Sequence, residues 1–105
     1  MNSNMPREER LALVRAFFYR VDVAVPPVVA HRNLAAEGAM WGRRTTENYL
    51  AELADDGFLW RVDPEQMEQG KYVEAEQGAR AYYLITPQGR REYRGATDDD
   101  DESTE

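Results

Sequence analysis

The chain of 105 residues contains no cysteine, only two serines and a single histidine. Without cysteine it cannot form a disulfide framework or a thiolate metal site. Ser3 and Ser103 lie close to the two ends of the chain, and His31 has no second histidine to complete a metal site. A glycine-rich phosphate loop is also missing. These absences argue against a Ser-His catalytic arrangement and against metal chemistry, so we expect no enzyme activity, no metal and no cofactor.

Long apolar runs are absent too. No segment approaches the about 18 consecutive apolar residues of a membrane-spanning helix, and the polar N-terminus does not resemble a signal peptide. We therefore expect a cytoplasmic protein without a membrane partner. Residues 98–105 hold six carboxylates and no apolar side chain, so they should repel one another and remain solvated. The predicted organisation is a loose N-terminus over residues 1–5, one folded domain over residues 6–94 and a disordered acidic tail over residues 95–105.

Basic residues are scarce relative to acids, and lysine is nearly absent. The net charge is −7, with 13 Lys and Arg against 20 Asp and Glu, and this balance as a whole argues against nucleic acid. Six of the acids lie in residues 98–105, so the remaining 97 residues are close to neutral. Lys71 is the only lysine. An acidic, lysine-poor composition suits a high-salt cytoplasm, although a GC-rich genome produces the same preference for arginine.

Apolar residues recur at every third or fourth position in the first half of the chain, which is the pattern of amphipathic helices. The spacing predicts three helices, over residues 7–20, 27–37 and 43–56. Gly38 and Gly57 follow the second and third of these segments, where glycine favours a helix end.

Aromatic and β-branched residues predict strands over residues 58–63 and 81–86. The intervening residues 64–80 are too many for a tight turn, and residues 71–76 within them are a candidate third strand. A short last helix is then predicted to run from Pro87 to about residue 94, with a threonine cap at residue 86.

This order of elements predicts an α+β fold, the winged helix. It has a three-helix core with a helix-turn-helix, followed by a two- or three-stranded antiparallel β wing. Gly89 is the one residue that weakens the prediction of the last helix, because glycine disfavours a helix interior.

Three segments resemble a known family. They are VPPVVAHRNL at residues 25–34, GRRTTENYLAELADDGFL at residues 42–59 and YLITPQGR at residues 83–90. Each is similar to a segment of the winged-helix regulators of the phage phi-H repressor type, from halophilic archaea. The resemblance implies sequence-specific binding of double-stranded DNA and regulation of transcription, with repression as the expected action. The chain departs from the family pattern in the middle of the third helix and in its long, acidic wing.

The candidate DNA-binding residues lie mainly at the start of the third helix. Arg43, Arg44 and Thr45 occupy its first turn, which in a helix-turn-helix faces bases and phosphates. Asn48 follows one turn later and suits an adenine, whereas arginine suits a guanine. Arg32, on the second helix, is expected to contact a phosphate. The alternative is an ordinary solvated helix face, and the acids at residues 52 and 55 should confine any contact to the first two turns.

The wing is less favourable for DNA. Arg61 and Arg80, close to the strands, are within the expected reach of phosphate, but the residues between the strands are acidic. A wing that enters a minor groove should be basic. An alternative function is therefore a winged-helix module that binds a protein partner through its acidic wing. The acids concerned, which face only one lysine, are Glu65, Glu68, Glu74 and Glu76.

Aromatic side chains and the C-terminal arginines leave further alternatives open. We expect the aromatic residues around the sheet to pack in the core, and any exposed subset would offer a homodimer surface, as would the first helix. The arginines at residues 90, 91 and 94 are either a second DNA contact or a counterweight to the acidic tail. The aromatic residues expected in the core or the sheet are Trp41, Trp60, Tyr82 and Tyr83.

Overall fold

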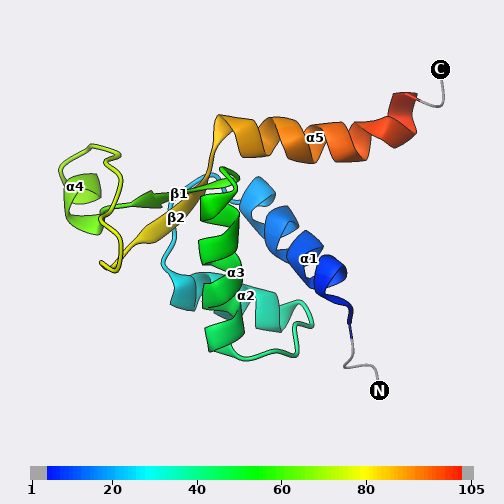
Figure 1. Ribbon diagram of the computed structural model, residues 1–105, viewed down its shortest axis with the longest axis horizontal. Helices are drawn as coiled ribbons and strands as arrows, with labels where there is room; N and C mark the ends of the chain where they lie inside the picture. The colour runs from blue at the N-terminus through cyan, green and yellow to red at the C-terminus, as the bar shows by residue number, and fades with distance from the viewer. Residues whose placement is uncertain (1–4, 103–105) are drawn as a thin grey trace.

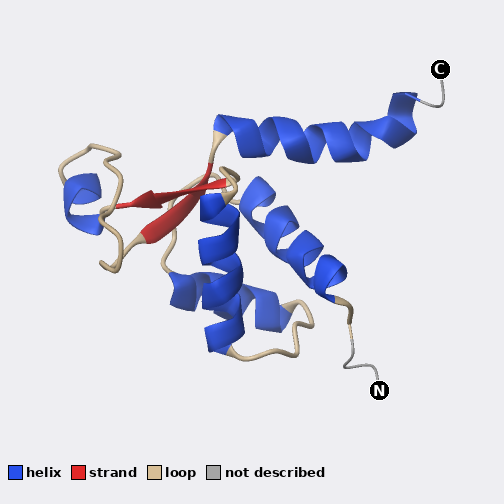
Figure 2. Cartoon of the chain, in the orientation of Figure 1, coloured by secondary structure: helices blue, strands red, loops and turns tan. Residues whose placement is uncertain are grey.

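Three helices precede a two-stranded antiparallel sheet that packs on them, and a further helix ends the chain (Figures 1 and 2). The structure is a computed structural model that describes residues 5–102, so the predictions for residues 1–4 and 103–105 lie outside the described residues. This α+β arrangement is consistent with the predicted winged helix. The elements are α1 (Arg7–Arg20), α2 (Pro27–Ala36), α3 (Arg43–Asp55), β1 (Leu59–Val62), α4 (Pro64–Glu68), β2 (Tyr82–Ile85) and α5 (Pro87–Glu102).

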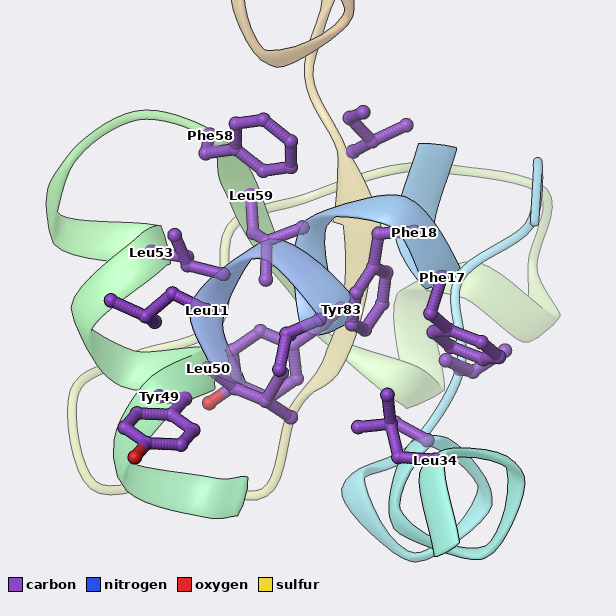
Figure 3. Close-up of a cluster of buried hydrophobic side chains, with 14 of the residues drawn as sticks. Leu11, Phe17, Phe18, Leu34, Tyr49, Leu50, Leu53, Phe58, Leu59 and Tyr83 are labelled. Carbon is purple, nitrogen blue, oxygen red and sulfur yellow. The ribbon is translucent and has the colours of Figure 1, made fainter. Parts of the chain in front are cut away.

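The core forms where α1, α2 and α3 meet the sheet. α1 buries the apolar face predicted from its spacing, with Phe17 and Phe18 in edge-to-face contact at a ring-centroid distance of 5.0 Å. Leu50 and Leu53 of α3 are completely covered, and Phe58 closes the core where β1 begins (Figure 3). The helices of a small domain draw most of their stability from such packing rather than from intrinsic propensity.

The sheet has two strands, so the candidate third strand over residues 71–76 is not formed. β1 and β2 pair from Leu59 opposite Ile85 to Val62 opposite Tyr82, while residues 71–76 contribute a single isolated bridge, between Glu74 and Val62. Residues 71–76 meet the end of β1 through two backbone hydrogen bonds, with residues 61 and 63, which are too few for a continuous ladder. The connection also contains a short helix, α4, that was not predicted from the sequence. We call residues 59–85 the wing and residues 63–81 the wing loop.

Asp63 is the residue that starts α4. Its carboxylate accepts hydrogen bonds from the backbone N–H groups of Glu65 and Gln66, at 2.9 and 3.4 Å, and Pro64 occupies the first helical position. An aspartate cap followed by proline is a recognised helix start, so the signal was present in the sequence.

Gly89 allows α5 to approach β1 closely. A Cβ atom at this position would lie 2.5 Å from the backbone carbonyl oxygen of Phe58, a separation that no alanine side chain can adopt. The Thr86 hydroxyl accepts a hydrogen bond from the Gly89 N–H at 2.8 Å and donates one to the Gly57 carbonyl at 2.6 Å. The predicted threonine cap is thus confirmed, and the glycine that weakened the helix prediction is required by packing.

The last helix is longer than the sequence suggested. α5 continues to Glu102, so residues 95–102, predicted as part of a disordered tail, are helical. No proline follows Pro87, and Gly95 is accommodated inside the helix. The ring of Tyr93 stacks on that of Tyr19 of α1 at 4.4 Å, and the C-terminal end of α5 extends away from the rest of the molecule (Figure 1).

None of the helices in residues 5–102 combines the length and the apolar character that crossing a bilayer requires.

Candidate nucleic-acid interface

α3 presents one exposed stripe along its length. Its buried side carries Thr46, Tyr49, Leu50 and Leu53, the same division of the helix that the sequence predicted. Residues spaced by three and four positions occupy one face of a helix. The stripe opposite the buried side consists of Arg44, Asn48, Ala51 and Asp55, of which all but the alanine are exposed.

Thr46 fixes the N-terminal half of α3 against the turn that precedes it. Its side chain is completely buried, and its hydroxyl accepts a hydrogen bond from Nε1 of Trp41 at 2.8 Å. Nδ1 of His31, on α2, lies 2.8 Å from the same hydroxyl oxygen. His31 thus takes part in a structural contact between α2 and α3. One oxygen joins α2, the turn and α3, and this junction orients the exposed stripe.

The two predicted contacts in the N-terminal half of the stripe have no partner among residues 5–96. Arg44 and Asn48 are exposed, and neither forms an ion pair or a side-chain hydrogen bond with another residue between 5 and 96. Thr45 is half-buried and likewise makes no side-chain hydrogen bond in that range. Their polar groups are therefore available to an external ligand.

Arg43 is arranged differently from Arg44. Its Nε lies 3.2 Å from a carboxylate oxygen of Glu47, one turn along the helix, and both side chains are exposed. An exposed pair of this kind contributes little to stability and is easily exchanged for another partner. Arg43 and Arg80 also line the same groove of about 580 Å³, between the N-terminal ends of α2 and α3 and the start of β2. The structure thus brings together one helical and one wing arginine.

Two arginines of α1 lie beside α3 or the turn before it, and neither was predicted from the sequence as part of the interface. Arg7 pairs with Glu52 of α3, and its guanidinium lies 6.0 Å from the centre of the Tyr49 ring. Arg10 lies over Trp41, at 5.4 Å from the ring centre. Arg7 and Glu52 are 45 positions apart, so only the tertiary fold reveals their contact.

The pairing of Arg7 with Glu52 changes the charge expected along α3. Glu52 raises the pKa of Arg7 above its ordinary value, chiefly through their side-chain hydrogen bond and then through charge attraction. In return, the cation offsets the negative charge that was expected to repel phosphate. Asp55, at the C-terminal end of the stripe, forms no ion pair with any residue between 5 and 96. The sequence predicted that both Glu52 and Asp55 would repel phosphate. With Glu52 paired to Arg7, the uncompensated negative charge is confined to Asp55.

The remaining predicted contacts lie on separate elements. Arg32 is exposed on α2 and has no ion-pair partner among residues 5–96. Arg61 is half-buried on β1 and lines the same hollows as Glu74 of the wing loop. Arg43 and Arg61 therefore lie close to acidic side chains, whereas Arg32 and Arg44 have no ion-pair partner among residues 5–96.

This surface can recognise a ligand through hydrogen bonds and charge, because the apolar side of α3 is kept in the core. Over the described residues, no three His, Asp or Glu side chains are grouped in a way that could hold a metal ion. Comparisons of the chain with models of protein families, with curated proteins and with solved structures find no match.

Proposed function

We propose that this protein binds double-stranded DNA through the first two turns of α3 and regulates transcription by occupying its binding site. The observation that carries the proposal is the pair Arg44 and Asn48. Both side chains are exposed in the N-terminal half of the stripe, one turn apart, and without a partner among residues 5–96. A rigidly held helix with free, base-competent side chains is what a major-groove reader requires.

Each polar side chain of the interface has a role that matches its chemistry. Arg44 suits the bidentate contact with O6 and N7 of a guanine, and Asn48 suits the corresponding contact with an adenine. Thr45 is placed to bond a phosphate or to meet a thymine methyl group. Arg32 and Arg43 are assigned to phosphates, which fix the position of the protein on the duplex without reading its sequence.

The scarcity of positive charge on the protein, whose net charge is −7, favours selective over general binding. Nonspecific affinity depends on the number of phosphates that lysine and arginine neutralise. Only a few arginines surround the stripe here, and the acids of the wing loop oppose a broader contact. Base-specific contacts therefore have to supply more of the affinity, which disfavours a general chromatin-type binder.

The test is the enrichment of genomic DNA fragments at molar potassium chloride by the wild-type chain and by Arg44→Ala/Asn48→Ala. Lys71→Ala is the matched control, because it removes one exposed cation from the wing loop. We expect the wild type and the control to enrich the same fragments and the double variant to enrich none of them. The proposal is wrong if no protein enriches any fragment, or if the double variant enriches the same set.

A further inference from the structure

The wing carries an exposed apolar surface that the proposed DNA contact does not use. Trp60 on β1 and Tyr72 and Val73 in the wing loop have 44, 58 and 42 % of their surface exposed. The rings of Trp60 and Tyr72 lie 6.5 Å apart. We call these three residues the wing patch. The expected packing of Trp60 is thereby corrected, because it lies in the sheet but is not buried. Trp60 is on the face of β1 opposite to the buried Leu59. Val62, on the same face as Trp60, is covered by a small cluster with Ala24 and Leu84 that does not include Trp60.

A small hollow lies within the wing patch. It has a volume of about 200 Å³ and is lined by Trp60, Arg61, Tyr72, Val73 and Glu74. Sites for small organic ligands usually measure about 300–1,000 Å³, so this hollow is below that size. Its dimensions are those of a socket for one side chain. Tryptophan, tyrosine and arginine are also the residue types that dominate binding energy at protein interfaces.

The backbone holds the wing patch in place before any partner arrives. Asp63 N–H donates to the Val73 carbonyl at 2.8 Å, and Ala75 N–H donates to the Arg61 carbonyl at 2.9 Å. These bonds attach the wing loop to the free edge of β1, and α4 shortens the remaining connection. A partner therefore encounters a formed surface, which reduces the loss of conformational entropy on binding.

The charges around the wing patch select the class of partner. Glu65, Glu68, Glu74 and Glu76 are all exposed, and none forms an ion pair with a residue between 5 and 96. Four carboxylates repel a phosphate backbone and attract cations. The aromatic faces of the patch add a favourable surface for arginine or lysine. Charge and shape together therefore favour a basic protein segment over nucleic acid.

We propose that the wing patch binds a protein segment that carries an apolar side chain flanked by arginine or lysine. The apolar side chain occupies the hollow between Trp60 and Tyr72. The flanking cations contact Glu74 and the other carboxylates of the wing loop. With α3 on DNA, this second surface would bring another protein to the bound site, but the contact itself does not depend on DNA.

The test uses a phage-displayed library of random dodecapeptides on the immobilised full-length chain. We expect the enriched peptides to combine at least one apolar residue with several cations. Binding of an enriched synthetic peptide should weaken by about tenfold or more in Trp60→Ala and in Tyr72→Ser, as for an aromatic anchor of an interface. If Trp60→Ala disturbs the fold of β1, Tyr72→Ser still tests the wing patch, because Tyr72 lies in the wing loop outside the strand.

Two control variants test whether the wing patch binds the peptide, rather than any exposed apolar or acidic side chain. Met40 lies between α2 and α3, outside the wing, and has 76 % of its surface exposed. Because distant sites act independently, Met40→Ala should bind the peptide within about twofold of the wild type. Glu8→Gln/Glu9→Gln changes two exposed acids of α1 and should have a smaller effect than Glu74→Gln/Glu76→Gln.

Three results would overturn the inference. They are the absence of enriched peptides, enriched peptides without cations, and equal binding to the wild type and to both wing-patch variants. Failure of the proposed DNA function is distinguishable, because Arg44→Ala/Asn48→Ala should bind the peptide as the wild type does. If Trp60→Ala and Tyr72→Ser instead abolish the enrichment of DNA fragments, the wing patch is a DNA contact and the proposed partner class is wrong.

Discussion

Nδ1 of His31 and Oγ1 of Thr46 lie 2.8 Å apart, and they join the only histidine of the chain to a completely buried threonine. Trp41 donates to the same oxygen from the turn between the two helices. The helix-turn-helix is therefore held by a polar junction as well as by its apolar core. Because a buried polar group without a partner is unfavourable, this junction admits few alternative arrangements.

Thr46→Val should destabilise the protein, since it removes the acceptor of the Trp41 N–H and leaves that part-buried donor without a partner. We expect the free energy of unfolding to fall by about 1–3 kcal/mol, measured by urea denaturation. Thr45→Val is the matched control, with the same chemical change one position earlier on a half-buried side chain. Equal losses in the two variants would show that the junction contributes nothing.

Gly89→Ala and Gly95→Ala should have opposite effects on stability. Both glycines lie in α5, where alanine is favoured over glycine by about 0.5–1 kcal/mol. At Gly95 no atom lies within 4 Å of an added Cβ, so the substitution should stabilise the protein. At Gly89 the added Cβ meets the Phe58 carbonyl oxygen, and overpacking should destabilise it by about 1–3 kcal/mol. Thermal unfolding measures both, and a stabilising Gly89→Ala would refute the close approach of helix and strand.

Arg7→Ala should weaken DNA binding without a direct contact between Arg7 and DNA. The substitution leaves Glu52 uncompensated one turn after Asn48 on α3, where a negative charge repels phosphate. We expect several-fold weaker binding of an enriched fragment by fluorescence anisotropy. Arg7→Ala/Glu52→Gln should restore most of the affinity, because the uncompensated acid is then gone. If the double variant binds as weakly as Arg7→Ala, Arg7 itself contacts the DNA.

Arg32→Ala should reduce affinity for all DNA sequences alike. A residue that neutralises one phosphate contributes about −0.9 to the slope of log K against log salt concentration. The slope should therefore become shallower by about this amount, while the preference for the enriched fragment over a scrambled one is unchanged. A changed preference with an unchanged slope would assign Arg32 to a base.

Local patterns predicted the helices and strands of the core to within one residue at their ends. α1 begins and ends where its apolar spacing indicated, and Thr86 caps α5 as expected. The sequence also placed Arg44 and Asn48 on the exposed side of α3. These features depend on residues close together in the chain, so a single sequence contains the signal.

Features that depend on distant residues were missed or misjudged. The pairing of Arg7 with Glu52 and the fit of Gly89 against Phe58 join separate elements, and no local pattern reports them. Trp60 is a large aromatic residue in a strand, a position that favours burial, yet its side chain is exposed. Only α4 had a local signal that went unused, the Asp63-Pro64 cap.

The proposed reading of DNA bases by Arg44 and Asn48 is tested by the ratio of the dissociation constants for a scrambled fragment and an enriched fragment, measured at one fixed concentration of potassium chloride. Each bidentate base contact is worth about 1–3 kcal/mol of discrimination. Arg44→Ala/Asn48→Ala should therefore reduce the ratio by at least about tenfold, whereas Lys71→Ala should leave it unchanged. A double variant that keeps the wild-type ratio would show that Arg44 and Asn48 do not read the bases.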